Sequence, residues 1–377
     1  MTTKLHRKLP YLLAAALTLA AGPAAAQTRE GTIGQTYNFD QLIGVLNNAL
    51  PAILTEDNSG VAKQLLGVKL APPLSQTFSL TAAKQGAFGF AQPALGPDCA
   101  RTGTPVGEPD QGECNLTLGT PEGQGAFKQL SFSKNMGLGN IRYLSRPGLV
   151  DPGKIPPIQV SDADALKIGV NHMLKFYGMQ LAEFPLPPSD APNQNPFVTT
   201  LTLGGVDDGG AAMTIPFAKL LTIPRGLNVN LMDSTGAVVM PFVPAPGRAQ
   251  VIVGGNGAVM GVMIENWREL RLDPTMSPAN AKPKSQLVRE IAEDLVGTAG
   301  GGAVRLAGLS AHIVYHADMR GTFGFLVPAV QIYATPVSGD LSAAQFDQIT
   351  SGHIGTAGLA REYSLIAPPQ QAPAETR

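Results

Sequence analysis

Residues 246–270, PGRAQVIVGGNGAVMGVMIENWREL, predict two strands joined by a glycine-rich turn. Apolar and β-branched residues lie on both sides of residues 254–257, and no helix cap follows them. A phosphate-binding loop would place its glycines at the start of a helix, where backbone N–H groups meet the anion. The stretch therefore predicts a hairpin rather than a phosphate cradle, with Asn256 and Gly257 both at positive φ.

Similar patterns recur along the chain. Its 43 glycines and 32 prolines are spread over the sequence, as in turn-rich antiparallel proteins. Strand candidates flank residues 233–236, and residues 77–93 and 303–335 each predict a hairpin. The alternation of single strands and helices that indicates a doubly wound parallel sheet is absent. We therefore predict an α+β fold, with helices packed on antiparallel β-meander sheets in repeated units.

Amphipathic spacing predicts the helices that cover these sheets. Residues 38–54 have apolar side chains on one face, and Pro51 ends the helix. Residues 161–179 begin with Ser161 as N-cap, and His172 on this helix is predicted to be a packed or boundary residue. The other predicted helices are residues 61–67, 285–297 and 341–349.

The order of these elements predicts five segments. A segment rich in proline and glycine, residues 146–160, indicates a linker near position 152. The segments are an export signal (1–26), an N-terminal α+β domain with the cysteines (27–152), a helix with a β-meander (153–275), a second helix with a hairpin (276–366) and a disordered tail (367–377).

The first 26 residues have the three parts of a secretory signal peptide. Lys4 and Arg7 precede an apolar run over residues 9–21, and three alanines at 24–26 would make Gln27 the first mature residue. A retained membrane anchor is the alternative, but the run is shorter than the roughly 20 residues that span a bilayer. We predict a secreted or periplasmic protein with no membrane span after cleavage.

The two cysteines agree with export. Cys99 and Cys114 lie in a polar, loop-like segment, and an oxidising compartment favours a disulfide between them. Such a bond would stabilise the fold by about 3 kcal/mol in the chain-entropy model. Two free thiols or a metal-binding pair are the alternatives, although no histidine lies nearby in the sequence to complete a metal site.

Two histidines that lie close to each other in the sequence are the clearest candidates for metal binding. His312 and His316 lie four positions apart in a strand-like segment, so that both side chains and Asp318 share one face while Tyr315 faces the other way. Imidazole and carboxylate groups bind Zn²⁺ or Cu²⁺. However, four strand positions span about 13 Å. The three residues remain candidates, and no metal or cofactor is predicted.

Motifs of common hydrolases are absent. Neither G-x-S-x-G nor H-E-x-x-H occurs in the chain, so no catalytic residue is assigned. A hydrolase of unfamiliar type remains an alternative, using His312, His316 or His353 with a nearby acid. The formal net charge of −1 predicts no basic surface for nucleic acid.

The only tryptophan, Trp267, closes the second strand of the 246–270 hairpin together with Arg268. Core packing is the more common role of such a tryptophan. A binding surface that includes Trp267 and Arg268 is the alternative.

One helix over residues 161–179 is followed by a meander whose central turn has the pattern G-x-G-x-V. This order resembles the PepSY-like and propeptide-like units of exported bacterial proteins. Such units are usually non-catalytic: they inhibit or chaperone a protease, or bind a partner in the envelope. The matching residues are 248–253, 254–257 and 259–268 in the meander, and Tyr315, Leu326 and Pro328 in the later hairpin.

The resemblance and the missing motifs lead to one expectation about function. We predict an exported, non-enzymatic binding or regulatory protein of the bacterial envelope or extracellular space. Its partner would be an envelope protein or peptide. The alternatives are the unfamiliar hydrolase and a metal-binding envelope protein.

Overall fold

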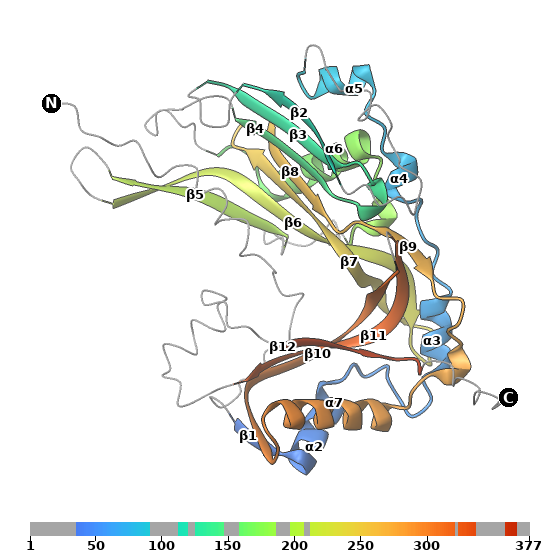
Figure 1. The fold of residues 1–377 in the computed structure, drawn as a ribbon. Coiled ribbons are helices and arrows are strands. Elements are labelled where there is room, and N and C mark those ends of the chain that lie inside the picture. Colours follow the sequence, from blue (N-terminus) through green and yellow to red (C-terminus); the bar gives the residue numbers. More distant parts are fainter. Residues whose placement is uncertain are drawn as a thin grey trace. The chain divides into compact units, whose positions relative to one another are not determined.

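A computed structural model describes residues 35–90, 112–119, 125–146, 158–185, 197–206, 212–320, 323–336 and 359–367. The protein contains helices and antiparallel sheets, which confirms the predicted α+β class (Figure 1). Among the described helices, none has the length and apolar character needed to cross a membrane. The predicted export signal, the helix over 341–349 and the tail beyond 367 lie outside the described residues.

The strands are β1 (Gln35–Asn38), β2 (Glu113–Leu118), β3 (Phe127–Ser133), β4 (Ile141–Arg146), β5 (Val198–Val206), β6 (Ala212–Met232), β7 (Val238–Gly254), β8 (Val259–Glu265), β9 (Glu269–Leu272), β10 (Ala303–Arg320), β11 (Phe323–Pro336) and β12 (Leu359–Ser364). The helices are α2 (Phe39–Ala49), α3 (Ser59–Leu66), α4 (Leu74–Thr77), α5 (Ala82–Ala87), α6 (Asp162–His172) and α7 (Lys284–Thr298). Short helical turns are η3 (Met136–Leu138), η5 (Met173–Tyr177), η6 (Leu181–Glu183) and η7 (Pro278–Asn280).

The described strands form two sheets. One has seven strands in the order β2-β3-β4-β8-β7-β6-β5. The other has the order β1-β10-β11-β12, with β9 also paired to β11.

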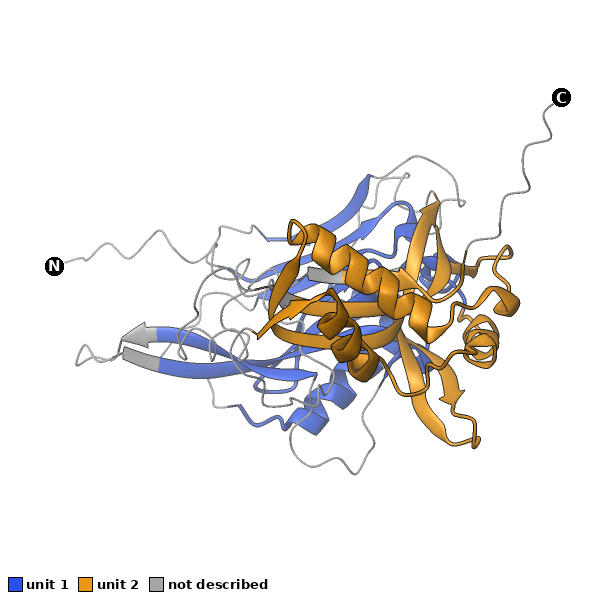
Figure 2. Ribbon diagram, turned by 90° about the horizontal axis from the view of Figure 1, so that it is seen from below, with its two compact units in different colours: residues 1–24, 72–225, 247–269 blue, residues 25–71, 226–246, 270–377 orange. Residues whose placement is uncertain are grey.

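Two compact units make up the chain, shown in blue and orange in Figure 2. Unit 1 comprises residues 1–24, 72–225 and 247–269, and unit 2 comprises residues 25–71, 226–246 and 270–377. These units are interleaved along the chain, whereas the predicted segments are consecutive. Two of the boundaries fall within β6 and β7, long neighbouring strands that each carry residues of both units, and another falls between residues 71 and 72.

Helix α6 packs on the seven-stranded sheet in unit 1. Ser161 is its N-cap, as predicted, and its side chain accepts a hydrogen bond from the backbone of Asp164 (3.1 Å). Gly169 allows a close approach, since a Cβ there would lie 2.8 Å from a side chain of β6. The helix continues into the π turn η5 and ends at Gly178, whose φ is +71°.

Unit 2 packs α2 and α7 against the sheet that contains β10 and β11 (Figure 1). Alternate residues of β10 face this core, and Ile313 and Tyr315 are buried there. The Tyr315 hydroxyl donates a hydrogen bond to the carbonyl oxygen of Leu65 (2.6 Å). Fully buried residues of the two helices are Leu42, Leu46, Leu287, Ile291 and Ala292.

The glycine turn between β7 and β8 is a hairpin loop, as predicted. Gly254 accepts a backbone hydrogen bond from Gly257 (2.9 Å) and donates one to Ala258 (2.8 Å). Gly257 has a φ of +82°, but Asn256 is not left-handed, so the expectation of two positive-φ residues is wrong. A three-residue hairpin loop needs only one left-handed residue, at its end. The β6–β7 loop has the same hydrogen bonds, with Gly236 at φ +83°.

The hairpin predicted over residues 77–93 is wrong where the structure describes it. The short helices α4 and α5 occupy this stretch instead. Thr81 begins α5, because its hydroxyl accepts a hydrogen bond from the backbone N–H of Lys84 (3.2 Å). The alanine, lysine and glutamine that follow favour helix, and this preference outweighs the apolar alternation.

Candidate functional site

The candidate histidines lie on β10, which confirms the predicted strand. His312 and His316 face away from the core that contains Tyr315, as the even spacing predicts. Gln331 of β11 lies opposite His312, and Tyr333 lies two residues further along the same face. The side chain of His316 is 50% exposed.

Glu362 of β12 is the acidic partner of His316 and was not predicted from the sequence. Its carboxylate accepts hydrogen bonds from His316 Nδ1 and from Gln331 Nε2, the latter at 3.0 Å. Glu362 lies opposite Gln331 in the strand register, which places it within reach of β10. A carboxylate at Nδ1 orients an imidazole ring and leaves Nε2 available for another contact.

We call His312, His316, Gln331, Tyr333 and Glu362 the polar strand face. The His312 and Tyr333 rings meet edge to face, with centroids 6.0 Å apart. Burial lowers the pKa of His312, so this ring is neutral at pH 7. Burial, and then the charge of Glu362, raise the pKa of Tyr333.

The three candidate metal ligands do not converge. His312 and His316 are four strand positions apart, about 13 Å along the strand, and Asp318 pairs with Arg320 (2.8 Å). Within the described ranges, no group of three or more His, Cys, Asp or Glu side chains could hold a metal ion.

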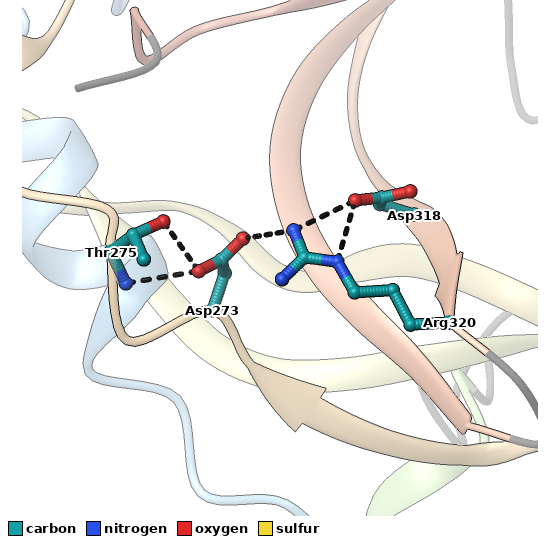
Figure 3. A network of polar contacts seen from close by, with 4 residues as sticks. All are labelled: Asp273, Thr275, Asp318 and Arg320. Carbon is teal, nitrogen blue, oxygen red and sulfur yellow. Dashed lines mark hydrogen bonds and ion pairs between the residues drawn. The ribbon is translucent and has the colours of Figure 1, made fainter. Parts of the chain in front are cut away.

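Asp318 belongs to a network around Arg320 (Figure 3). Arg320 also donates to Asp273 Oδ2 (3.0 Å), and its guanidinium lies 4.3 Å from the centroid of the Phe325 ring. The other Asp273 oxygen accepts hydrogen bonds from the backbone N–H (2.9 Å) and hydroxyl (2.6 Å) of Thr275. Burial raises the pKa of Asp273. The hydrogen bonds from Thr275 and the charge of Arg320 together lower it by more, so the pKa of Asp273 is below its usual value.

Trp267 lies in the core of unit 1 and is 2% exposed, so the alternative of a binding surface at this residue is wrong. Its indole N–H donates to Glu183 (3.4 Å), and the Arg225 guanidinium lies 5.2 Å from its ring. Arg225 donates to Glu183 Oε1 (2.7 Å) and to the carbonyl oxygen of Arg268 (2.7 Å). Arg268 thus contributes its backbone carbonyl oxygen to the contacts of Arg225, while its own side chain is half-buried.

The predicted disulfide involves a residue beyond the described ranges. Cys114 is buried in β2, whereas Cys99 and the candidate His353 both lie outside the described residues. The disulfide stays a prediction.

His172 packs in an aromatic cluster of unit 1, as predicted. Its ring lies 4.5 Å from that of Phe176 and 5.7 Å from that of Tyr177. Among the described residues, His172 Nε2 and the Tyr177 hydroxyl are buried without a hydrogen-bond partner. Burial, and then the charge of Lys175, lower the pKa of His172 to about 4.

The polar strand face therefore combines an oriented imidazole with exposed aromatic and polar groups. Such a surface can donate and accept hydrogen bonds, and an oriented imidazole can also accept a proton. Comparison of the chain with protein-family models, curated proteins and solved structures finds no match. The resemblance to PepSY-like units stays a prediction.

Proposed function

We propose that this chain is an exported, non-enzymatic binding protein whose polar strand face contacts an envelope protein or peptide. The observation that supports this most directly is the alignment of two imidazoles, a phenol and a carboxylate from three strands along one face of the sheet, where the phenol, Tyr333, is 44% exposed. Tyrosine is enriched where protein interfaces concentrate their binding energy, since it combines a large ring with a polar tip.

The charge state of this face suits a partner of mixed apolar and polar character. Glu362 already accepts hydrogen bonds from His316 and Gln331, so a partner would not bury an unpaired carboxylate. His312 is neutral at pH 7 because burial lowers its pKa. The Tyr333 hydroxyl and the free edge of the His316 ring would then hydrogen-bond to the partner.

Site-specific photocrosslinking tests this proposal. A benzophenone amino acid placed at Tyr333 should form a discrete adduct with one partner in envelope fractions of the producing bacterium. The matched control places it at Val238 of β7, which is 50% exposed and lies outside the polar strand face. Equal adducts at both positions, or none at position 333 in a folded protein, would contradict the proposal.

Export is part of the proposal and rests on residues 1–26. Mass spectrometry of the protein from periplasm or medium should find Gln27 as the first residue. A protein that begins at Met1 and stays with the membrane would exclude export. The proposal also includes the repeated helix-and-strand units that the sequence predicts. They resemble PepSY-like units, which are usually non-catalytic, and this resemblance favours a binding role over a catalytic one.

A hydrolase is the second candidate, favoured by one specific observation. Glu362 contacts Nδ1 of His316, as the acid contacts the histidine in Ser–His–Asp triads. In that case purified protein would turn over an ester, glycoside or peptide, and His316→Ala would lower the rate by about 10²–10⁴-fold. His312→Ala is the matched control, expected to retain the rate. The binding proposal predicts no turnover in any of these proteins.

A further inference from the structure

Strand β5 ends the seven-stranded sheet, and among the described strands it pairs only with β6 (Figure 1). Its nine residues, VTTLTLGGV, include no charge and no proline. Of the other strands at sheet margins, β2, β9 and β12 contain charged residues, and β1 has only four residues. Charge, proline and short length are devices that stop edge strands from pairing with other chains. β5 has none of these.

The backbone of β5 is also regular. Leu201 lies opposite Ala218. Thr202 lies opposite Pro216, so Phe217 of β6 is the extra residue where the register shifts. Phe217 accepts a backbone hydrogen bond from the β7–β8 turn (3.2 Å). The extra residue of this irregularity therefore lies in the inner strand, and the outer strand has no extra residue in this pairing.

Every second residue of β5 directs its backbone groups away from β6. The carbonyl oxygen of Phe197 accepts a hydrogen bond from Thr222 of β6 (2.8 Å), which sets the alternation. The residues whose N–H and C=O groups then point away from β6 are Val198, Thr200 and Thr202. The side chains of Thr200 and Thr202 are exposed.

We propose that β5 pairs with β5 of a second copy of this chain, antiparallel, across a two-fold axis at Leu201. Thr200 of each copy then lies opposite Thr202 of the other, and the two exchange their outward hydrogen bonds. No like charges meet in this register, and threonine pairs are favourable across strands. Leu203, which is 39% exposed, loses contact with water on pairing.

Sedimentation velocity of the full mature chain tests the pairing. The wild type should form a concentration-dependent dimer. Thr200→Pro should raise the dissociation constant about tenfold or more, because the N–H it removes points away from β6 and the internal ladder stays intact. Leu203→Lys should do the same by adding a charge to the edge, whereas the matched control Leu203→Thr should remain dimeric. Circular dichroism should be unchanged in all three variants. At protein concentrations below the dissociation constant of the wild-type dimer, their melting should match that of the wild type, apart from the small effect in Thr200→Pro of losing the exposed hydrogen bond from Lys219 to the Thr200 hydroxyl (2.8 Å).

A cysteine cross-link tests the register. Leu201→Cys should form an intermolecular disulfide on mild oxidation, because the two copies of this residue face each other on the axis. Thr199→Cys is the matched control, since its two copies would lie about 13 Å apart along the strands. A monomeric wild type, or a dimer that persists in both Thr200→Pro and Leu203→Lys, would overturn the proposal. Binding of an extended foreign peptide to β5 of a monomeric chain would also overturn the proposal.

Discussion

Unit 1 and unit 2 hold their charged side chains in different environments. In unit 1 the Glu183–Arg225 ion pair is enclosed, with 3% and 2% of the two residues exposed. In unit 2 the Asp273 side chain is only 3% exposed, but that of its partner Arg320 is 48% exposed. Water cannot replace a lost partner inside a core, but it can at the surface. The same kind of pair should therefore contribute very differently to the stability of the two units.

Removal of Glu183 should have the largest effect. Glu183→Ala leaves Arg225 buried without its carboxylate, and we expect a loss of about 3–5 kcal/mol in the free energy of unfolding. Denaturant unfolding at pH 7 measures this loss. The double variant Glu183→Leu with Arg225→Met should recover much of it, because neither charge remains. If the single variant loses less than about 1 kcal/mol, the contrast between the units is wrong.

The buried His172 of unit 1 should make stability depend on pH. Its pKa is about 4 in the folded protein, against 6.5 when unperturbed. Between these values the unfolded chain binds a proton that the folded chain does not, so stability is complete above about pH 6.5 and falls toward pH 4, by about 3 kcal/mol at most. Unfolding measured at pH 7 and 4.5 should show a smaller fall for His172→Phe than for the wild type. The half-exposed His316 offers the control: His316→Ala should retain the fall that His172 causes.

Loss of the Asp273 charge should have an intermediate effect. Asp273→Asn weakens the contacts to Arg320 and Thr275, and we expect a cost of about 1–2 kcal/mol, since water partly replaces the exposed arginine's contact. The folded pKa of Asp273 is below its usual value, so its contribution is present above the unfolded pKa of 3.8 and is lost as the pH falls through the folded pKa. Unfolding curves at pH 7 and 3 test both effects. Asp318→Asn, at the exposed partner, should change stability by less than about 0.5 kcal/mol.

The exposed pair on α7 should have the smallest effect. Arg289 and Glu293 lie 2.9 Å apart with side chains 71% and 56% exposed. Arg289→Ala should cost at most about 0.5 kcal/mol at low salt, and less at high salt because ions screen the pair. Unfolding at two salt concentrations measures this. A cost above about 1 kcal/mol would show that exposure is a poor guide to the strength of these pairs.

Much of the candidate site could be predicted from the spacing of a few residues. The even separation of His312 and His316 places them on one face of β10, and the odd position of Tyr315 places it in the core. Glu362 could not be predicted, because it lies 46 positions from His316 in the chain. Its proximity depends on the register of β12 against β11, which no local pattern encodes.

The errors in the fold have a local origin instead. Residues 77–90 have apolar alternation that suits a strand, but the Thr81 cap and the helix-forming residues after it produce α5. Asn256 adopts no left-handed conformation because its hairpin has a three-residue loop, in which Gly257 alone takes positive φ. The start of α5 depends on capping, and the conformation of Asn256 depends on loop length. In each case two local preferences compete within the same few residues.

The sequence alone determined the positions of the turns at 233–236 and 254–257, the N-cap at Ser161 and the two faces of β10, since backbone preferences and short-range hydrogen bonds act within a few residues. Only the tertiary structure decided that Trp267 packs with Glu183 and Arg225, that Glu362 reaches His316, and that β5 lies at the margin of its sheet. Burial and strand pairing depend on which distant segments come together, because side chains lose water only where another part of the chain covers them.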